Sequence, residues 1–252
     1  MPEQKLYGSS LIKAKEILDF MVTASEAPEL KEVSAGTGIG KPTTLKILNT
    51  MVELGLVRRV GSEKRYYLGT DFIAYAEKAT DDFDLLQYAK PALTKLRDET
   101  DETINLGVES RNSVVLLDKI ESKNRSIKLK SQVGGKMTLY SSSMGKAILS
   151  TWSDKKLQDY ADEIDFKKIA PNTITTPSRL IEEIDSVKNR GYSTDNEENE
   201  PEVYCIGFSL TKNNKLVGAF SITAPKYRMT KKNREKYLEF AKQAQQEIEK
   251  AL

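Results

Sequence analysis

The apolar positions in the first forty residues predict two short helices. In the first helix they recur at the helical spacing of three or four positions, on Leu11, Ala14, Leu18 and Met21. Two serines, Ser9 and Ser10, stand directly before this stripe and predict an N-cap. The second helix covers ELKEVSAG, with Leu30 and Val33 facing inward. A short turn then leads into a third helix.

The third predicted helix runs from Pro42 to about Leu54, and its pattern allows two rotations. One apolar stripe comprises Thr44, Ile47, Leu48 and Met51. With that stripe inward, the opposite side presents Pro42, Leu45, Lys46 and Asn49. A rival inward face comprises Leu45, Leu48 and Val52. Proline suits the first helical position, because its missing N–H would be unpaired there.

Two short extended segments follow, LVRRV and RYYLG, joined by the polar turn GSEK. A glycine-bearing polar turn between such segments predicts a hairpin. Three helices followed by a hairpin form a winged helix-turn-helix, in which the third helix enters the major groove of DNA. We therefore predict a DNA-binding domain over residues 1–70.

Local charge agrees with this prediction. Between residues 36 and 65, only Glu53 and Glu63 are acidic, against six basic residues. These basic residues are Lys41, Lys46, Arg58, Arg59, Lys64 and Arg65. A solvated surface is the alternative for any single one of them, but basic residues on a recognition helix and wing are typical of DNA contacts. We expect the DNA-binding residues to be these six with Pro42, Thr43, Leu45 and Asn49.

The remainder of the chain alternates helical and extended patterns, so we predict an α+β protein. Residues 71–80 contain neither proline nor glycine and predict a connecting helix. Residues 81–252 then form a second domain, in which a helical pattern is kinked or restarted at Pro91. Extended segments follow at TINLGVE, SVVLLDKI and SIKLK. Helical patterns return near KAILS, SDKKLQDYADEI, SRLIEEIDSVKNR and the C-terminal NREKYLEFAKQAQQEIEKAL.

A hairpin near the C-terminus is the most informative part of this second domain. YCIGFSL and KLVGAFSIT flank TKNN, and pairing about that turn would set Cys205 opposite Ser221. One face of the two strands is bulky and apolar, and comprises Ile206, Phe208, Leu210, Leu216, Phe220 and Ile222. The other face is small and weakly polar, which leaves either room for a small polar ligand or close packing against another backbone.

Two stretches look like phosphate-binding loops and fail at their anchor positions. In AGTGIGKPTTL, Ala35 replaces the first glycine and Pro42 replaces the hydroxyl residue after the lysine. In SSSMGKA, Tyr140 and Ala147 stand at the same two positions. The serines of the second stretch instead predict the N-cap of a helix, whose unpaired N–H groups attract carboxylates.

Composition removes several classes of function. The 252 residues include no histidine, so neither a Ser-His-Asp arrangement, nor a Cys-His pair, nor a histidine-ligated zinc site can be built. Cys205 is the only cysteine, which excludes an internal disulfide and fits a reducing cytosol. No apolar segment is long enough to span a bilayer, and the N-terminus lacks an export signal. We expect a cytoplasmic protein that is not an enzyme, with no metal, no cofactor and no membrane partner.

Several of these stretches also resemble a known family. LIKAKEILDF, TGIGKPTTLKILNTMVELGLV and YYLG are similar to the start of the IclR family of bacterial transcription regulators. SSSMGKAILS and GYSTDNEENEPEVYCIGFSL resemble the two signature stretches of its ligand-binding domain. The resemblance implies a winged helix-turn-helix joined by a helix to a GAF-like α/β domain with a curved antiparallel sheet. It also implies a homo-dimer or tetramer on a palindromic double-stranded DNA operator.

The same resemblance implies an effector site. Its residues would be Ser142, Ser143, Met144, Asp195, Cys205, Ser221 and Thr223. The family usually has glycine and alanine where this chain has Ser143 and Met144, which makes the pocket wall bulkier. In the DNA-binding domain, the family usually has serine or threonine at Pro42 and arginine at Lys46. The operator sequence therefore does not transfer from relatives, because lysine lacks the two-pronged fork with which arginine reads guanine.

The resulting prediction is a ligand-responsive repressor of a catabolic or carbon-metabolism operon that senses a small oxo- or hydroxy-carboxylate. Two alternatives come from other classes. One is an enzyme of carboxylate metabolism that uses Asp195 or Cys205, and the other is a winged-helix module that binds protein or RNA without a ligand. A basic third helix and wing favour DNA, and small polar groups without an assembled acid–base pair favour sensing over turnover.

Overall fold

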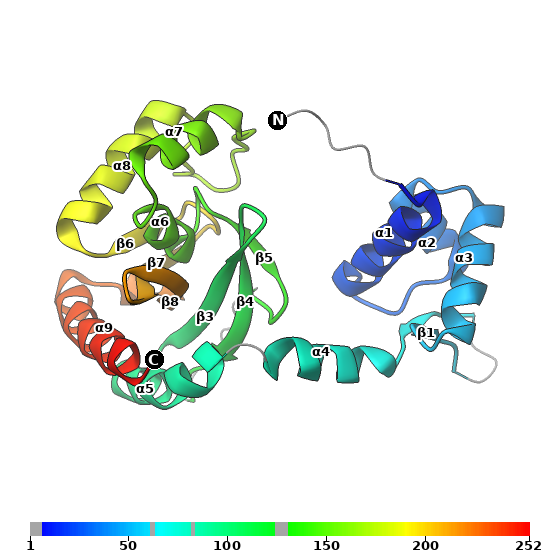
Figure 1. Cartoon of the computed structure of the whole chain (residues 1–252), viewed down its shortest axis with the longest axis horizontal. Coiled ribbons are helices and arrows are strands. Elements are labelled where there is room, and N and C mark those ends of the chain that lie inside the picture. The colour runs from blue at the N-terminus through cyan, green and yellow to red at the C-terminus, as the bar shows by residue number, and fades with distance from the viewer. Residues whose placement is uncertain (1–6, 61–63, 82–83, 124–130) are drawn as a thin grey trace. The chain divides into compact units, whose positions relative to one another are not determined.

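The computed structural model describes residues 7–60, 64–81, 84–123 and 131–252 and divides the chain into two compact units. The first unit is Met1–Asp82 and the second is Phe83–Leu252 (Figure 1). Each unit has its own hydrophobic core. The residues that were expected to form the tip of the first hairpin, 61–63, and the extended segment 126–130 lie outside the described residues.

The first unit contains four helices and a small hairpin among its described residues. These elements are α1 (Ser9–Thr23), α2 (Leu30–Thr37), α3 (Lys41–Glu53), β1 (Val57–Arg58), β2 (Tyr67–Leu68) and α4 (Asp71–Asp81). The two strands pair antiparallel, with Val57 opposite Leu68. An isolated bridge between Glu29 and Arg65 adds the loop before α2 to this hairpin. A helix-turn-helix with a wing is therefore present, as the sequence predicts.

The first helix differs from its prediction in two respects. It begins at Ser9 itself, after Gly8 in the left-handed conformation, and no side chain caps it. Leu11 was expected in the apolar stripe but is 75% exposed, whereas Ile17 is fully buried. The core of this unit is small and contains Ile17 and Met21 from α1, so a residue in the first turn of the helix remains at the surface.

The third helix adopts the first of its two possible rotations. Thr44 and Leu48 are fully buried, whereas Leu45 is 39% exposed. The Thr44 hydroxyl donates a 3.0 Å hydrogen bond to the main-chain carbonyl of Ile39 in the turn before α3. A threonine in the apolar stripe is thus satisfied inside the core, and the helix presents the Lys46 side to solvent.

The second unit is built on one six-stranded antiparallel sheet with the order β5-β4-β3-β8-β7-β6. Its strands are β3 (Thr103–Ser110), β4 (Ser113–Ile120), β5 (Lys136–Thr138), β6 (Ser193–Asn196), β7 (Val203–Lys212) and β8 (Lys215–Pro225). Its helices are α5 (Asp84–Thr100), α6 (Ser143–Leu149), α7 (Asp154–Glu163), α8 (Pro177–Arg190), the short 3-10 helix η1 (Lys226–Arg228) and α9 (Lys231–Ala251). Helix α5 continues through Pro91 rather than restarting there.

Helices cover both faces of this sheet (Figure 1). On one face, α5 and α9 pack on the bulky residues that the alternation predicts, such as Phe208 and Phe220, whose rings stack at 5.4 Å. On the other face, α6 lies on the small residues and is itself covered by α8. At Gly207 the packing is so close that a Cβ atom would lie 2.6 Å from the backbone of Ser143. At Gly207, therefore, the small face of the sheet packs closely against another backbone, which is one of the two alternatives that the sequence left open.

The register of the β7–β8 hairpin corrects the sequence prediction. The turn is the two-residue pair Asn213–Asn214, both with positive φ, rather than the four residues TKNN. The tighter turn shifts the register by one residue, and a bulge on β8 between Leu216 and Gly218 shifts it by one more, so Cys205 pairs with Thr223 and not with Ser221. Leu216 also changes sides, because the bulge shifts the alternation, and it packs against the α6 face instead of the α5–α9 face.

Candidate functional site

The outward face of α3 is the first candidate site, and it collects six of the expected DNA-binding residues. All six side chains are exposed: Lys41, Pro42, Thr43, Leu45, Lys46 and Asn49. The helix follows Gly38 in the left-handed conformation, with Lys41 as its first residue and Pro42 in its first turn. The two lysines lie near the N-terminal half of the helix, where a positive macrodipole end already favours a phosphate.

The wing presents two arginines beside this helix, each held over a tyrosine ring. The guanidinium of Arg58 lies 5.0 Å from the ring centre of Tyr67, and that of Arg59 lies 5.4 Å from the ring centre of Tyr66. Tyr66 is buried, so its ring is a fixed platform. Stacking of this kind limits the rotamers of an exposed arginine without neutralising its charge. Lys64 is exposed as well.

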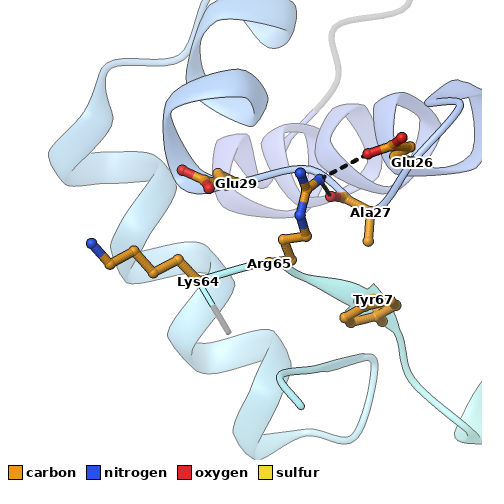
Figure 2. Close-up of a pocket in the computed structure, with 6 residues that line it drawn as sticks. All are labelled: Glu26, Ala27, Glu29, Lys64, Arg65 and Tyr67. Atoms are coloured by element: carbon orange, nitrogen blue, oxygen red, sulfur yellow. Dashed lines mark hydrogen bonds and ion pairs between the residues drawn. The ribbon is translucent and has the colours of Figure 1, made fainter. Parts of the chain in front are cut away.

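Arg65 occupies a different environment from the other five basic residues. Its Nη1 donates a 2.6 Å hydrogen bond to the carbonyl of Ala27 and lies 3.5 Å from a carboxylate oxygen of Glu26. Figure 2 shows this guanidinium directed at the loop between α1 and α2, while Lys64 extends away from it. These residues line an open hollow of about 590 Å³ together with Glu29 and Tyr67.

The start of α6 is the first part of the expected effector site. Ser142 is the N-cap, as predicted: its Oγ accepts a 3.1 Å hydrogen bond from the N–H of Gly145 and donates to the carbonyl of Thr138. Ser143 and Met144 are each 2% exposed. The Ser193 hydroxyl donates a 2.5 Å hydrogen bond to the carbonyl of Ser143, which holds α6 against β6.

The central strands contribute a chain of polar side chains. The hydroxyls of Ser221 and Thr223 lie 3.3 Å apart, and the amide of Asn105 donates a 3.0 Å hydrogen bond to Thr223. The Ser131 hydroxyl in turn donates to the Asn105 carbonyl oxygen at 3.3 Å. Asn105 lies opposite Ser221 in the β3–β8 register. Sequence analysis did not identify Asn105, although it alternates with apolar residues on a buried strand.

Asp195 and Cys205 lie opposite each other on β6 and β7. One Asp195 oxygen accepts hydrogen bonds from the N–H groups of Glu198 (2.7 Å) and Asn199 (3.2 Å). Burial nevertheless raises the pKa of Asp195 from 3.8 to about 7. Burial, followed by the nearby Asp195 charge, raises the pKa of the Cys205 thiol. A thiol in this environment stays protonated and is a poor nucleophile.

A buried ion pair that the sequence analysis missed lies behind this site. Lys146 on α6 is fully buried and pairs with both carboxylate oxygens of Glu198, at 2.6 and 2.7 Å. Glu183 on α8 lies 3.4 Å from the same ammonium group. The available signal was a charged residue inside the apolar run MGKAIL. The expected effector residues thus come from the start of α6 and from strands β6, β7 and β8.

The described residues offer neither a membrane span nor a metal site. Among them, no helix has both the length and the apolar character needed to cross a membrane. Within the same ranges, no group of three or more cysteine, aspartate or glutamate side chains could hold a metal ion.

Comparison with known proteins gives two matching family models. Residues 77–250 match the C-terminal domain of the bacterial transcriptional regulator IclR, and residues 10–61 match the IclR helix-turn-helix domain. Among curated proteins, the chain is 29% identical to the transcriptional regulator KdgR of Dickeya chrysanthemi, over 91% of this chain and 75% of that protein. It is 25% identical to the acetate operon repressor of Salmonella typhimurium, over 88% and 81% of the two chains.

Solved structures agree with these matches. The crystal structure of IclR from Thermotoga maritima is 32% identical, with a TM-score of 0.77 over 96% of this chain and 98% of that one. An IclR homologue from Microbacterium hydrocarbonoxydans, crystallised with 4-hydroxybenzoate, has a TM-score of 0.82 at 19% identity, over 96% and 98% of the two chains. Because the identity to the second structure is only 19%, that comparison supports the fold alone.

Proposed function

This chain belongs to the IclR family of bacterial transcriptional regulators, and from that premise we propose that it represses an operon of carbon metabolism in response to a small carboxylate. Membership of this family establishes that the chain is a DNA-binding regulator. The repressor role and the kind of operon are supported by the similarity to the acetate operon repressor.

The observation that carries the DNA-binding half of this proposal is the exposed face of α3. Its side chains enter the major groove: Lys41, Pro42, Thr43, Leu45, Lys46 and Asn49. Arg58, Arg59 and Lys64 on the wing contact the phosphate backbone. The tyrosine platforms support this assignment, because they orient two cations before DNA arrives and reduce the entropy that binding must remove.

One winged helix-turn-helix reads one half-site, so we assign the functional protein as a homo-dimer or tetramer on a palindromic operator. Helix α4 carries two exposed apolar side chains, Ile73 (69% exposed) and Tyr75 (58% exposed), and in this proposal a second subunit covers them.

The effector occupies the α6 face of the sheet in this proposal. The N–H groups of Ser143 and Met144 bind its carboxylate after Ser142 begins the helix, and the hydroxyls of Ser221 and Thr223 bind a keto or hydroxyl oxygen. Asp195 faces that same oxygen. Because burial raises the Asp195 pKa to about 7, this carboxyl can donate a hydrogen bond near neutral pH, which an ionised aspartate cannot do.

An enzyme of carboxylate metabolism is disfavoured by the same geometry. Cys205 lies beside Asp195, but burial keeps its thiol protonated, and the chain contains no histidine to activate it. The polar residues of this site can bind an acid but supply no activated nucleophile. Turnover of a panel of oxo- and hydroxy-acids by the purified protein would contradict this assignment.

DNA footprinting on the region upstream of the chain's own gene tests the proposal. We expect the native protein to protect a palindromic segment, and a small oxo- or hydroxy-acid to change that protection. If the protein protects a segment and no acid in the panel alters that protection, the DNA-binding function is supported and the proposed class of effector is wrong. If the protein protects no segment, the proposal that an operator lies upstream of its own gene is wrong.

A further inference from the structure

Five of the six basic residues between positions 36 and 65 are exposed on α3 or the wing, but Arg65 is directed at another part of the same unit (Figure 2). Its side chain is 38% exposed and its Nη1 hydrogen bond to the Ala27 carbonyl is 2.6 Å long. A bond of that length from a cation to a carbonyl is at the strong end for a protein. Glu26, 3.5 Å from the same nitrogen, adds a negative charge on the same side.

The Arg65 contact is one of two consecutive attachments between the wing and the α1–α2 loop. The next residue along the wing, Tyr66, donates its backbone N–H to the carbonyl of Pro28 at 2.9 Å. The carbonyls of Ala27 and Pro28 therefore accept from Arg65 and Tyr66 in the same order. The backbone bridge between Glu29 and Arg65 extends this line of contacts.

The loop that receives these bonds is in turn fixed to α2. Glu29 caps that helix in a reciprocal arrangement with Glu32, in which the Glu29 N–H donates to the Glu32 carboxylate at 2.7 Å. Helix α2 leads through the turn into α3, the helix that presents Lys41 and Lys46. The attachments of Arg65 and Tyr66 thus connect the wing to the element that carries α3.

We propose that Arg65 is a positioning residue: it clamps the wing to the α1–α2 loop and sets the place of Arg58 and Arg59 relative to α3. For Arg65, this positioning role takes the place of the DNA contact that the local charge predicts. The consequence for DNA rests on the proposed function, whereas the clamp itself is a property of the first unit alone.

The clamp and a phosphate contact make opposite predictions for the salt dependence of DNA binding. Each phosphate contact that is lost reduces the slope of log affinity against log salt by about 0.9. A residue that only positions the wing changes the affinity and not that slope, because Arg58 and Arg59 neutralise the same phosphates once the wing is seated on DNA. The neighbouring Lys64 is exposed and provides the matched control, since the proposed function assigns it to the phosphate backbone.

The experiment uses the full chain, the variants Arg65→Met and Lys64→Met, and a mixed-sequence 30-base-pair duplex titrated at several salt concentrations. We expect Lys64→Met to reduce the slope by about 0.9, and Arg65→Met to leave it unchanged. Methionine retains most of the apolar stem of Arg65 and removes its charge and its donors. A slope reduced by about 0.9 in Arg65→Met as well would overturn the proposal.

Hydrogen–deuterium exchange by mass spectrometry measures the clamp without DNA. In Arg65→Met, the peptide covering residues 64–70 should exchange about tenfold faster, equivalent to about 1.4 kcal/mol, because the Tyr66 N–H loses its neighbouring attachment. Lys64→Met should exchange as the native protein does, and the α3 peptide, Lys41–Glu53, should be unchanged in both. Native exchange in Arg65→Met would refute the clamp.

A general loss of protection in α3 would mean that Arg65→Met does not fold. In that case the variant Arg65→Lys tests the clamp. It keeps the charge, but its side chain is one atom shorter than the path to the Nη1 atom that contacts both Ala27 and Glu26, so the 64–70 peptide should still exchange faster with the salt slope unchanged. Native-like exchange in Arg65→Lys overturns the proposal. If the native protein shows no salt-dependent affinity for the duplex, the proposed function fails, and the exchange measurement still decides the clamp.

Discussion

The ammonium group of Lys146 lies 2.6 Å from one carboxylate oxygen of Glu198 and 2.7 Å from the other, and the lysine side chain is completely buried. Glu198 also donates its backbone N–H to Asp195, and its carbonyl accepts from the Thr173 hydroxyl at 2.6 Å. The ion pair therefore joins α6 to the residues that follow β6, which are two parts of the proposed effector site.

Removing only one partner of this pair should destabilise the second unit. We expect Lys146→Met to lower the free energy of unfolding by about 3–5 kcal/mol, because Glu198 is left as an uncompensated buried charge. Lys146→Met combined with Glu198→Leu should recover most of that loss in urea denaturation. Equal losses in the single and double variants would show that the charge of Glu198 is not the cause.

Two basic residues on different elements should both contribute to DNA affinity. In Lys46→Ala combined with Arg58→Ala, the slope of log affinity against log salt should fall by about 0.9 for each phosphate contact removed. Filter binding or fluorescence anisotropy at several salt concentrations measures this. Lys168→Ala, an exposed lysine of the second unit, is the control and should leave the slope as it is. An unchanged slope in the double variant would contradict the assignment.

The assembled protein should protect two half-sites on its operator. Their centres should be one helical turn apart or a multiple of it, because one winged helix-turn-helix reads one half-site. Light scattering should report a dimer or tetramer at micromolar concentration. A monomer that binds DNA one-to-one would exclude this arrangement.

The hydroxyls of Ser221 and Thr223 should contribute to effector binding. Calorimetric titration with small oxo- and hydroxy-acids should show weaker binding to Ser221→Ala combined with Thr223→Val than to the native protein. The acid should change operator affinity by about 1–3 kcal/mol, the usual size of an allosteric coupling. Ser178→Ala, a serine at the start of α8, is the control. Identical titrations of the native and double-variant proteins would place the ligand elsewhere.

The stability of the second unit should decrease as the pH rises from about 4 to about 7. Burial raises the pKa of Asp195 from 3.8 to about 7, so in this window the folded protein holds a proton that the unfolded chain has released. Stability falls with pH wherever the folded state binds more protons, by up to about 4 kcal/mol for a shift of this size. Burial also raises the pKa of Glu198, which acts in the same direction.

The measurement is urea unfolding at a series of pH values for the native protein and for Asp195→Asn. The variant cannot ionise at this position, so its stability should depend less steeply on pH between about 4 and 7. Parallel curves for the two proteins would show that another group is responsible.

Much of the local structure follows from short-range sequence patterns. The helix that begins at Asp71, the N-cap at Ser142 and the two-faced alternation of β7 were all predictable, and the structure contains each of them. Helical periodicity, capping hydroxyls and strand alternation depend on residues only a few positions apart. The identity of the family also follows from such stretches, because its signature motifs are contiguous.

The tertiary structure decided what those patterns left open or predicted wrongly. The rotation of α3 depends on which stripe fills the core, and a tighter turn together with a bulge on β8 moved the partner of Cys205 from Ser221 to Thr223. Arg65 carries the same charge as Arg58, Arg59 and Lys64, yet its partner Ala27 lies 38 residues away. Rotation, register and the partner of a charged side chain are set by contacts between distant segments. No local pattern encodes them, because the free energy of such a contact depends on both segments at once.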